Sequence, residues 1–188
     1  MRYPHEVRII AGENRSRKIK TPEDKSIRPT SNRSREAIFN MLSHARNGMS
    51  VIYGARVLDL FAGTGAMGLE CLSRGAEHAT FLDINTEIVR ENIADLEETA
   101  KSTILTCDYK DLPEADEAVD IIFIDPPYDS ALVEPALKLL KQNGWIHERT
   151  IVVAESSSQE MYKVPGDYNK FDERVYGASR FSFLTNAA

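Results

Sequence analysis

From residue 50 onward, short apolar runs alternate with segments in which apolar residues recur at helical spacing. The apolar runs are nearly continuous, as expected for strands buried on both faces. They occupy residues 55–62, 78–84, 102–108, 119–125 and 150–156. Helical spacing is found at residues 66–75, 86–100 and 133–142. This alternation predicts an α/β fold with a mostly parallel sheet that is covered by helices on both faces.

Two further segments refine this picture. Residues 173–185 contain two strand-like runs around a Gly-Ala-Ser turn, which predicts an antiparallel hairpin at the edge of the sheet. Residues 86–100 predict an amphipathic helix whose inward residues are Ile88, Ile93, Leu96 and Ala100.

The N-terminal part has a different pattern. Residues 8–21 have apolar ends around a turn at Gly12 to Asn14, which predicts a small β-hairpin. Residues 28–45 predict a helix, and the candidates for its N-cap are Thr30, Ser31 and Asn32. We therefore expect an N-terminal extension over residues 1–46 and a main domain over residues 47–188.

Charge supports this division. The first 46 residues contain 11 Lys and Arg against 5 Asp and Glu, a balance of +6, whereas the remainder stands at −12. A basic extension on an acidic body is suited to meeting a phosphate backbone at one chosen face. Arg33 and Arg35 lie in the first turn of the predicted helix, where the helix dipole disfavours cations by about 0.3 to 1 kcal/mol each.

Composition excludes several classes of protein. The 188 residues are 42% hydrophobic and 28% charged, as in an ordinary soluble domain. No stretch approaches the roughly 18 apolar residues that span a bilayer, and no secretory leader is recognisable, so we expect a cytoplasmic protein without a membrane partner. Two cysteines and four scattered histidines predict neither a disulfide framework nor a metal site.

A glycine-rich turn follows the first apolar run of the main domain. Asp59 ends the run, and Gly63, Gly65 and Gly68 follow as the chain enters a helix, so backbone amides can approach a ligand there. Asp83 ends the second run twenty positions after Gly63, where an open α/β sheet places an acid against ribose hydroxyls.

The chemistry of this turn narrows the ligand. A Walker loop is excluded because the turn lacks Gly-Lys-Ser or Gly-Lys-Thr. An anionic dinucleotide stays possible, but Asp59, Asp83 and Asp108 favour a cofactor with positive charge and many hydroxyls. S-adenosylmethionine, which has a sulfonium, an ammonium and a ribose, fits this field, and Asp108 is placed to accept from an adenine amino group.

Several motifs together resemble one family. "DLFAGTGAMGLE", "FLDIN", "CDYKDL" and "DPPY" are similar to the motifs of Rossmann-like, S-adenosylmethionine-dependent methyltransferases. With "RIIAGENRSRKIKTP", "RPTSNRSREAIFNML" and "YGASRFSFL", nearly the whole chain resembles the bacterial 16S ribosomal RNA guanine-N2 methyltransferases of the RsmD family. Two positions depart from the family pattern, since Ser16 stands where a glycine is expected and Glu13 where a basic residue is expected.

The resemblance implies a cofactor site and a catalytic motif. The cofactor site is assigned to Asp59, Phe61, Gly63, Gly65, Asp83, Ile84, Asp108 and Tyr109. The catalytic motif is Asp125, Pro126, Pro127 and Tyr128. The Asp125 carboxylate and the Pro126 carbonyl would accept the two N–H groups of a nucleobase amine, while the prolines fix the turn and Tyr128 stacks on the base. Positioning of this kind can lower a barrier by roughly 7 to 11 kcal/mol without a strongly tuned general base.

The resemblance also implies the partner, which is 16S ribosomal RNA in an assembling small subunit, bound by a monomer. Unstacking the target base costs a few kcal/mol in a duplex and less in a loop, which favours single-stranded or bulged RNA. The predicted RNA-contacting residues are Arg15, Arg17, Lys18, Lys20, Arg28, Arg33 and Arg35.

Other functions remain open at this point. An adenine-N6 methyltransferase on RNA or DNA would use the same clamp, because the clamp recognises an amine and not a particular ring. A protein-glutamine methyltransferase typically begins this motif with Asn rather than Asp. An RNA-binding assembly factor could retain the fold without catalysis, although pure binding requires neither Asp125 nor the glycine turn.

Overall fold

The computed structural model describes residues 7–22, 32–44, 50–127, 131–159 and 162–187. The strands are β1 Val7–Arg8, β2 Lys18–Ile19, β3 Arg56–Leu60, β4 His78–Asp83, β5 Ser102–Thr106, β6 Val119–Ile124, β7 Ile146–Ser157, β8 Tyr168–Tyr176 and β9 Ser179–Asn186. The helices are α1 Asn32–Ser43, α2 Ala66–Ser73, α3 Glu87–Asp95 and α4 Val133–Gln142, with 3-10 turns η1 Thr99–Lys101 and η2 Tyr109–Asp111.

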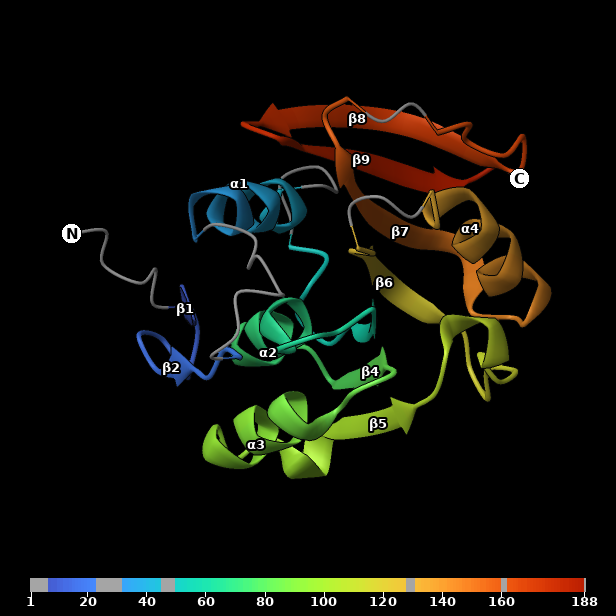
Figure 1. The fold of residues 1–188 in the computed structure, drawn as a ribbon. Coiled ribbons are helices and arrows are strands. Elements are labelled where there is room, and N and C mark those ends of the chain that lie inside the picture. The colour runs from blue at the N-terminus through green and yellow to red at the C-terminus, as the bar shows by residue number, and fades with distance from the viewer. Residues whose placement is uncertain (1–6, 23–31, 45–49, 128–130, 160–161, 188) are drawn as a thin grey trace.

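Seven of these strands form one twisted sheet in the order β5-β4-β3-β6-β7-β9-β8 (Figure 1). The four pairings from β5 to β7 in that order are parallel, and β9 is antiparallel to both β7 and β8. The prediction of a parallel sheet with an antiparallel C-terminal hairpin is therefore confirmed. The second strand of the hairpin lies against β7, so the first strand, β8, becomes the outer edge.

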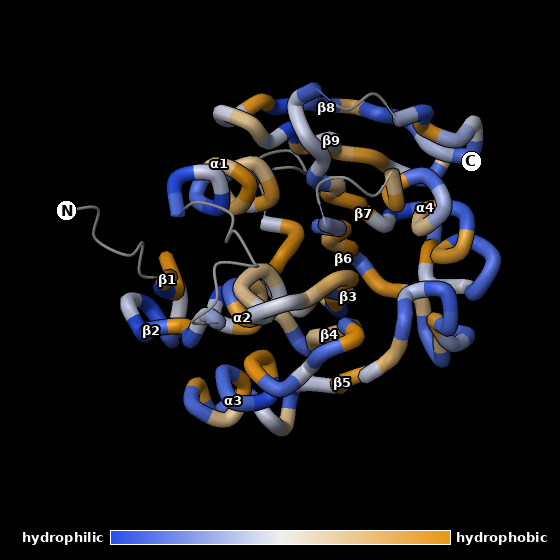
Figure 2. The backbone as a smooth tube through the Cα atoms, in the orientation of Figure 1, coloured by the Kyte–Doolittle hydropathy of each residue, from blue (hydrophilic) through white to orange (hydrophobic). Residues whose placement is uncertain are grey.

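The sheet separates two apolar layers, and the tube in Figure 2 is predominantly hydrophobic along its central strands. One layer joins the sheet to α1, α2 and α3 through residues such as Phe39, Leu72 and Val89. The other joins the opposite face to α4 and η2 through residues such as Leu137 and Tyr109. Because both faces are covered, the near-continuous apolar runs in β3, β6 and β7 have a direct physical reason.

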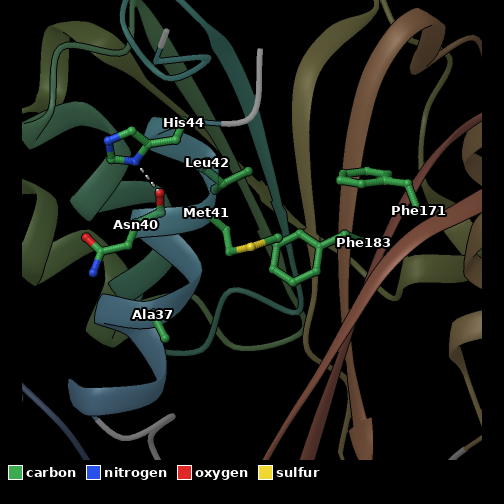
Figure 3. Close-up of a pocket in the computed structure, with 7 residues that line it drawn as sticks. All are labelled: Ala37, Asn40, Met41, Leu42, His44, Phe171 and Phe183. Carbon is green, nitrogen blue, oxygen red and sulfur yellow. Dashed lines mark hydrogen bonds between the residues drawn. The ribbon is translucent and has the colours of Figure 1, made fainter. Parts of the chain in front are cut away.

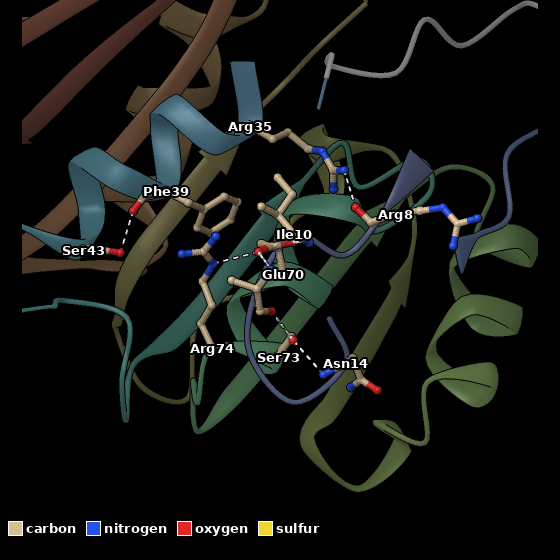
Figure 4. Close-up of polar contacts among 10 residues, drawn as sticks. Arg8, Ile10, Asn14, Arg35, Phe39, Ser43, Glu70, Ser73 and Arg74 are labelled. Carbon is tan, nitrogen blue, oxygen red and sulfur yellow. Dashed lines mark hydrogen bonds and ion pairs between the residues drawn. The ribbon is translucent and has the colours of Figure 1, made fainter. Parts of the chain in front are cut away.

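The N-terminal hairpin is attached to α2 by a buried carboxylate (Figure 4). Glu70 is fully buried, and its two oxygens accept the backbone N–H groups of Ile10, at 2.7 Å, and Ala11, at 3.0 Å. Arg74 donates to the same carboxylate from Nε at 2.7 Å. A buried charge is tolerated only when it is paired and hydrogen-bonded, and Glu70 meets both conditions with partners from two segments.

The hairpin loop lies against the last turn of α2. Ser73 Oγ donates to the carbonyl of Ala11 at 2.6 Å and accepts the N–H of Asn14 at 3.0 Å. Gly12 has φ 86°, and a Cβ at this position would lie 1.7 Å from the carbonyl oxygen of Ser73. A glycine is therefore required here both by its backbone conformation and by the close approach.

Ser16 explains one departure from the family pattern. It has φ 69°, the left-handed conformation that glycine adopts at least cost. This backbone conformation explains why the family pattern has a glycine at this position. In this chain Ser16 adopts it instead, with some local backbone strain.

The expected inward face of α3 is partly wrong. α3 ends at Asp95, because Glu97 has φ 63° and breaks the helical path. Ala100 consequently lies exposed in η1, and Val89, which is fully buried, takes the place on the inward face that was assigned to the half-buried Ile88. Ile93 and Leu96 are buried as expected.

Two expectations about α1 lie partly beyond the described residues. α1 begins at Asn32, and the alternative N-caps Thr30 and Ser31 lie outside the part of the chain that the structure describes. The division at residue 46 stays a prediction. The hairpin and α1 contribute Ile9, Ile19 and Phe39 to the same apolar layer as the sheet, so the two segments share a core.

Among the described residues, no helix is long and apolar enough to cross a bilayer. In the same part of the chain, Cys71 and Cys107 are free thiols, and His, Cys, Asp and Glu form no cluster of three or more that could hold a metal ion.

The attachment of the hairpin can be tested with Glu70→Ala. The substitution leaves two backbone N–H groups and the Arg74 cation without their buried acceptor, so we expect a loss of about 3 to 5 kcal/mol in the free energy of unfolding. Urea denaturation measures this loss. Glu36→Ala on the exposed side of α1 is the control and should change stability by less than about 0.5 kcal/mol. Equal effects of the two variants would show that Glu70 does not hold the hairpin.

Candidate active site

The residues assigned to chemistry gather at the carboxyl ends of adjacent strands. β3 lies between β4 and β6 in the sheet, and all three run parallel. Leu60 of β3 pairs with Ile124 of β6, and the next residue, Asp125, donates its backbone N–H to the Leu60 carbonyl at 3.5 Å. The glycine turn after β3 and the Asp-Pro-Pro turn after β6 are therefore direct neighbours.

The glycine turn requires unusual backbone angles at three positions. Phe61, Gly63 and Gly65 have φ values of 68°, 52° and 76°. A Cβ on Gly65 would also come within 2.6 Å of a methyl group of Val89 in α3. The turn thus brings its backbone close to α3 at the start of α2.

Asp59 organises the turn from inside. Its side chain is buried, and Oδ2 accepts the N–H of Gly68 in α2 at 3.0 Å. Burial raises the pKa of the Asp59 carboxyl to about 7, the negative charge of Asp83 adds to the increase, and the hydrogen bond from Gly68 opposes it. Asp59 therefore fixes the shape of the turn, because its carboxylate is directed at the turn's own backbone.

Asp83 joins the ends of β3 and β4. Oδ2 accepts the N–H of Gly63 at 2.8 Å, and Oδ1 accepts the N–H of Asn85 at 3.1 Å. Each carboxylate oxygen has a second lone pair, so the fixed Asp83 side chain can still accept from ribose hydroxyls.

An apolar surface lies beside these acids. Ile84 follows β4 and is 74% exposed, which is unusual for a large aliphatic side chain. After β3, the half-buried Phe61 packs against Tyr109 with ring centroids 5.3 Å apart. Asp108 is exposed next to Tyr109, and it accepts the N–H of Lys110 at 2.9 Å. An apolar platform with an acceptor at its rim is suited to a flat adenine ring, so the residues present fit S-adenosylmethionine.

The Asp-Pro-Pro turn is only partly described. Asp125 is half-buried, Pro126 is buried and Pro127 is exposed. Tyr128 lies outside the described residues. These three residues follow directly after Ile124, the last residue of β6, so the buried strand fixes the backbone position of Asp125.

The predicted RNA-contacting residues divide into several groups. Arg15 and Lys18 are exposed on the hairpin, and Arg33 is exposed at the start of α1. Arg17 donates to Asn14 Oδ1 at 2.9 Å and to the carbonyl of Asp95.

Lys20, Arg28 and Arg35 complete the predicted set. The Lys20 ammonium lies 3.0 Å from Glu91 and 2.9 Å from Asp95, and these contacts raise its pKa, with the Asp95 hydrogen bond contributing most. Arg28 lies outside the described residues.

Arg35 was predicted to contact RNA, and its position in the structure contradicts this. It is fully buried, and its guanidinium donates to the Arg8 carbonyl at 2.6 Å (Figure 4). The guanidinium also donates to Asn32 Oδ1 at 2.7 Å. Burial lowers the pKa of Arg35, the buried Glu70 charge opposes this by favouring the cation, and the nearby Arg74 charge adds to the decrease. These interior contacts contradict the prediction that Arg35 contacts RNA.

A cavity of about 460 Å³ lies away from the strand ends, between α1 and the β8–β9 hairpin (Figure 3). Its lining residues are Ala37, Asn40, Met41, Leu42, His44, Phe171 and Phe183. The cavity contains none of the residues assigned to cofactor or catalysis.

Sequence reasoning missed three residues at or near the site. Glu70 anchors the hairpin, and Asn92 ties α3 to both neighbours by donating to the carbonyls of Lys20 and Thr64. Glu155 lies near the end of β7 and is 4% exposed. The signal for Glu155 was present, because an acid after an apolar run had already marked Asp59, Asp83 and Asp125.

The buried Asp59 predicts a pH dependence of stability. An acid whose folded pKa is raised favours folding most below its unfolded pKa near 4 and loses that contribution as the pH rises through about 7. Asp59→Asn keeps an acceptor for Gly68 and removes the titration. Between about pH 5 and pH 8, the wild type should lose about 2 to 3 kcal/mol relative to this variant. Urea denaturation at several pH values measures the difference, and parallel curves would refute the raised pKa.

The chain is similar to a family of known proteins. Residues 7–185 match the family model described as conserved hypothetical protein 95. Ribosomal RNA small subunit methyltransferase D of Escherichia coli strain K12 is 34% identical over 176 residues, which cover 92% of this chain and 86% of that protein.

Solved structures agree with the match. The structure of yhhF from Escherichia coli, described as a methyltransferase, has a TM-score of 0.82 at 32% identity, covering 96% of this chain and 98% of its own. A structure described as a methyltransferase complexed with SAH has the same fold, with a TM-score of 0.60 at 18% identity, covering 80% of this chain and 49% of its own. As the sequence motifs predicted, the chain belongs to the family of conserved hypothetical protein 95, the RsmD family.

Proposed function

We propose that this protein transfers a methyl group from S-adenosylmethionine to the exocyclic N2 of a guanine in 16S ribosomal RNA, within an assembling small subunit in the cytoplasm. The enzyme class is supported by the family and by the relative named ribosomal RNA small subunit methyltransferase D. The guanine, the assembling particle and action as a monomer are the finer parts of the proposal.

One observation carries the proposal. The Asp-Pro-Pro turn after β6 and the glycine turn after β3 are neighbours, because Leu60 pairs with Ile124 and Asp125 bonds back to Leu60. An amine held at the first turn therefore lies beside a cofactor held at the second. Reaction between two bound groups requires this closeness, and the parallel pairing of the strands supplies it.

S-adenosylmethionine held at the glycine turn would supply a methyl carbon on a sulfonium. The nitrogen lone pair would attack that carbon in line, and the sulfur would leave with the electrons of the C–S bond as S-adenosylhomocysteine. The residues of this chain prepare the nitrogen. The Asp125 carboxylate and the Pro126 carbonyl accept its two N–H groups, which draws the lone pair out of conjugation with the ring and aims it. Pro126 and Pro127 donate no competing hydrogen bond, and their fixed φ angles hold the carbonyl in place. Asp125 accepts the proton after the new bond has formed.

The exposed cations of the hairpin and α1 support an RNA substrate. Arg15, Lys18 and Arg33 are exposed on a segment that shares its core with the catalytic sheet, so a phosphate held there has a fixed position relative to the strand ends. Phosphate contacts of this kind position a nucleic acid without reading its sequence.

The reaction is tested with labelled cofactor and small subunits from cells that lack this enzyme. We expect label in RNA and N2-methylguanosine on nucleoside analysis, whereas N6-methyladenosine, or label in protein alone, would overturn the proposal. Asp125→Ala should lower turnover by at least about 100-fold with cofactor affinity retained, because the amine loses its principal acceptor. Asp125→Asn is the matched control and should keep part of the activity, since its amide oxygen still accepts one N–H.

The RNA face is tested by neutralising Arg15 and Lys18 together with Gln. Loss of two phosphate contacts should weaken RNA binding and reduce the slope of log affinity against log salt by about 1 to 2. Lys20→Gln is the control, because Glu91 and Asp95 already neutralise that ammonium. Binding measured at several salt concentrations decides the matter, and an unchanged slope in the double variant would remove the hairpin from the RNA-binding surface.

A further inference from the structure

Glu155 occupies the position beside Asp125 on the neighbouring strand. β6 and β7 pair in parallel, and their last register pair is Ile124 with Ala154. Glu155 follows Ala154 within β7, and Asp125 follows directly after the end of β6, so the register continued by one residue sets the two acids side by side. Neighbouring strands lie about 4.8 Å apart, which brings two carboxylates to adjacent places at the same edge of the sheet.

Both acids also belong to the same face of the sheet. Phe123 and Val153 pack in the layer that contains α1, and side chains two residues apart along a strand share a face. Glu155 is moreover paired with Phe181 of β9, which packs in that same layer. Glu155 therefore belongs to the face of the sheet that α1 covers. The alternation of side chains along β6, continued by one residue, assigns Asp125 to the same face.

The Glu155 carboxylate is buried, which strengthens its interactions with neighbouring polar groups. Glu155 is 4% exposed, and its strand neighbours Val153 and Phe181 are 3% and 2% exposed. In such surroundings a hydrogen bond to a carboxylate is stronger than in water, and an acceptor forced against it is more unfavourable. A group in this position discriminates between donors and acceptors more sharply than an exposed acid does.

The nucleobases differ in what they present next to the reacting amine. Beside its N2 amine, guanine has an N1–H donor. Beside its N6 amine, adenine has an N1 lone pair, which is an acceptor. Asp125 alone recognises an amine and accepts either ring, whereas a second carboxylate at the adjacent atom accepts from guanine and repels adenine.

We propose that Glu155 is the residue that selects guanine over adenine, by accepting the N1–H of the base whose N2 amine is held by Asp125. The inference rests on the proposed function, because it assigns the substrate specificity of that same site. The Asp-Pro-Pro turn thus binds the reacting amine, and Glu155 of β7 distinguishes guanine from adenine.

The test uses 2-aminopurine, which keeps the 2-amino group and replaces the N1–H donor with an acceptor. RNA carrying guanine or 2-aminopurine at the methylated position is compared with wild type and Glu155→Gln. The wild type should prefer guanine in kcat/KM, and Glu155→Gln should reduce that preference at least about 10-fold, because an amide can donate to the acceptor. Glu148→Gln, the same change at the exposed start of β7, is the control and should leave the preference unchanged.

Binding provides a readout that does not depend on turnover. If Glu155→Gln is folded but inactive, the ratio of the two RNA affinities is measured directly, and the same 10-fold reduction is expected. If the Gln variant does not fold, Glu155→Asp replaces it, and a specificity role predicts that guanine preference persists while the rate falls. An unchanged preference in a folded Gln variant, or a preference lost in the Asp variant, overturns the role of Glu155. Failure of the proposed function is distinct, since the wild type would then form no N2-methylguanosine.

Discussion

Parallel pairing of β3 with β4 and β6 is the constraint on which the site depends. Parallel strands all end at the same edge of a sheet, so residues that follow β3, β4 and β6 meet although they are far apart in the chain. The side-chain period of a strand is two, and a slip of one residue in β6 would turn Asp125 to the other face. Apolar burial on both sides of the sheet prevents such a slip, so the hydrophobic pattern sets the register that places Asp125 beside the glycine turn.

A second constraint joins the N-terminal segment to this sheet. Glu70 is a buried acid whose acceptors are filled by the hairpin backbone and by Arg74, and the nearby Arg35 guanidinium bonds to the hairpin carbonyl of Arg8. Removing one partner of such a buried charge is strongly destabilising, because the other partner is left uncompensated. The basic extension therefore shares an apolar core with the sheet.

The sequence was sufficient for the strands, most of the helices and the edge hairpin, because their periodicity is a local property that burial then enforces. Asp83 and Asp125 could be recognised as strand ends for the same reason. Tertiary contacts could not be recognised. Arg35 has the sequence signature of an RNA-binding cation, and only its packing near Glu70 reveals that it is interior. Ala100 fits a helical period that the left-handed Glu97 interrupts.

The contact between Gly12 and Ser73 has a consequence for how a target nucleotide is chosen. At Gly12 the hairpin backbone lies directly against the backbone of α2, and the N–H of Glu13 donates to the Ser73 carbonyl at 2.8 Å. The hairpin and the glycine turn are therefore held at a fixed distance from each other. An RNA strand gripped at the hairpin would offer to the glycine turn only the nucleotide at a set spacing along its backbone.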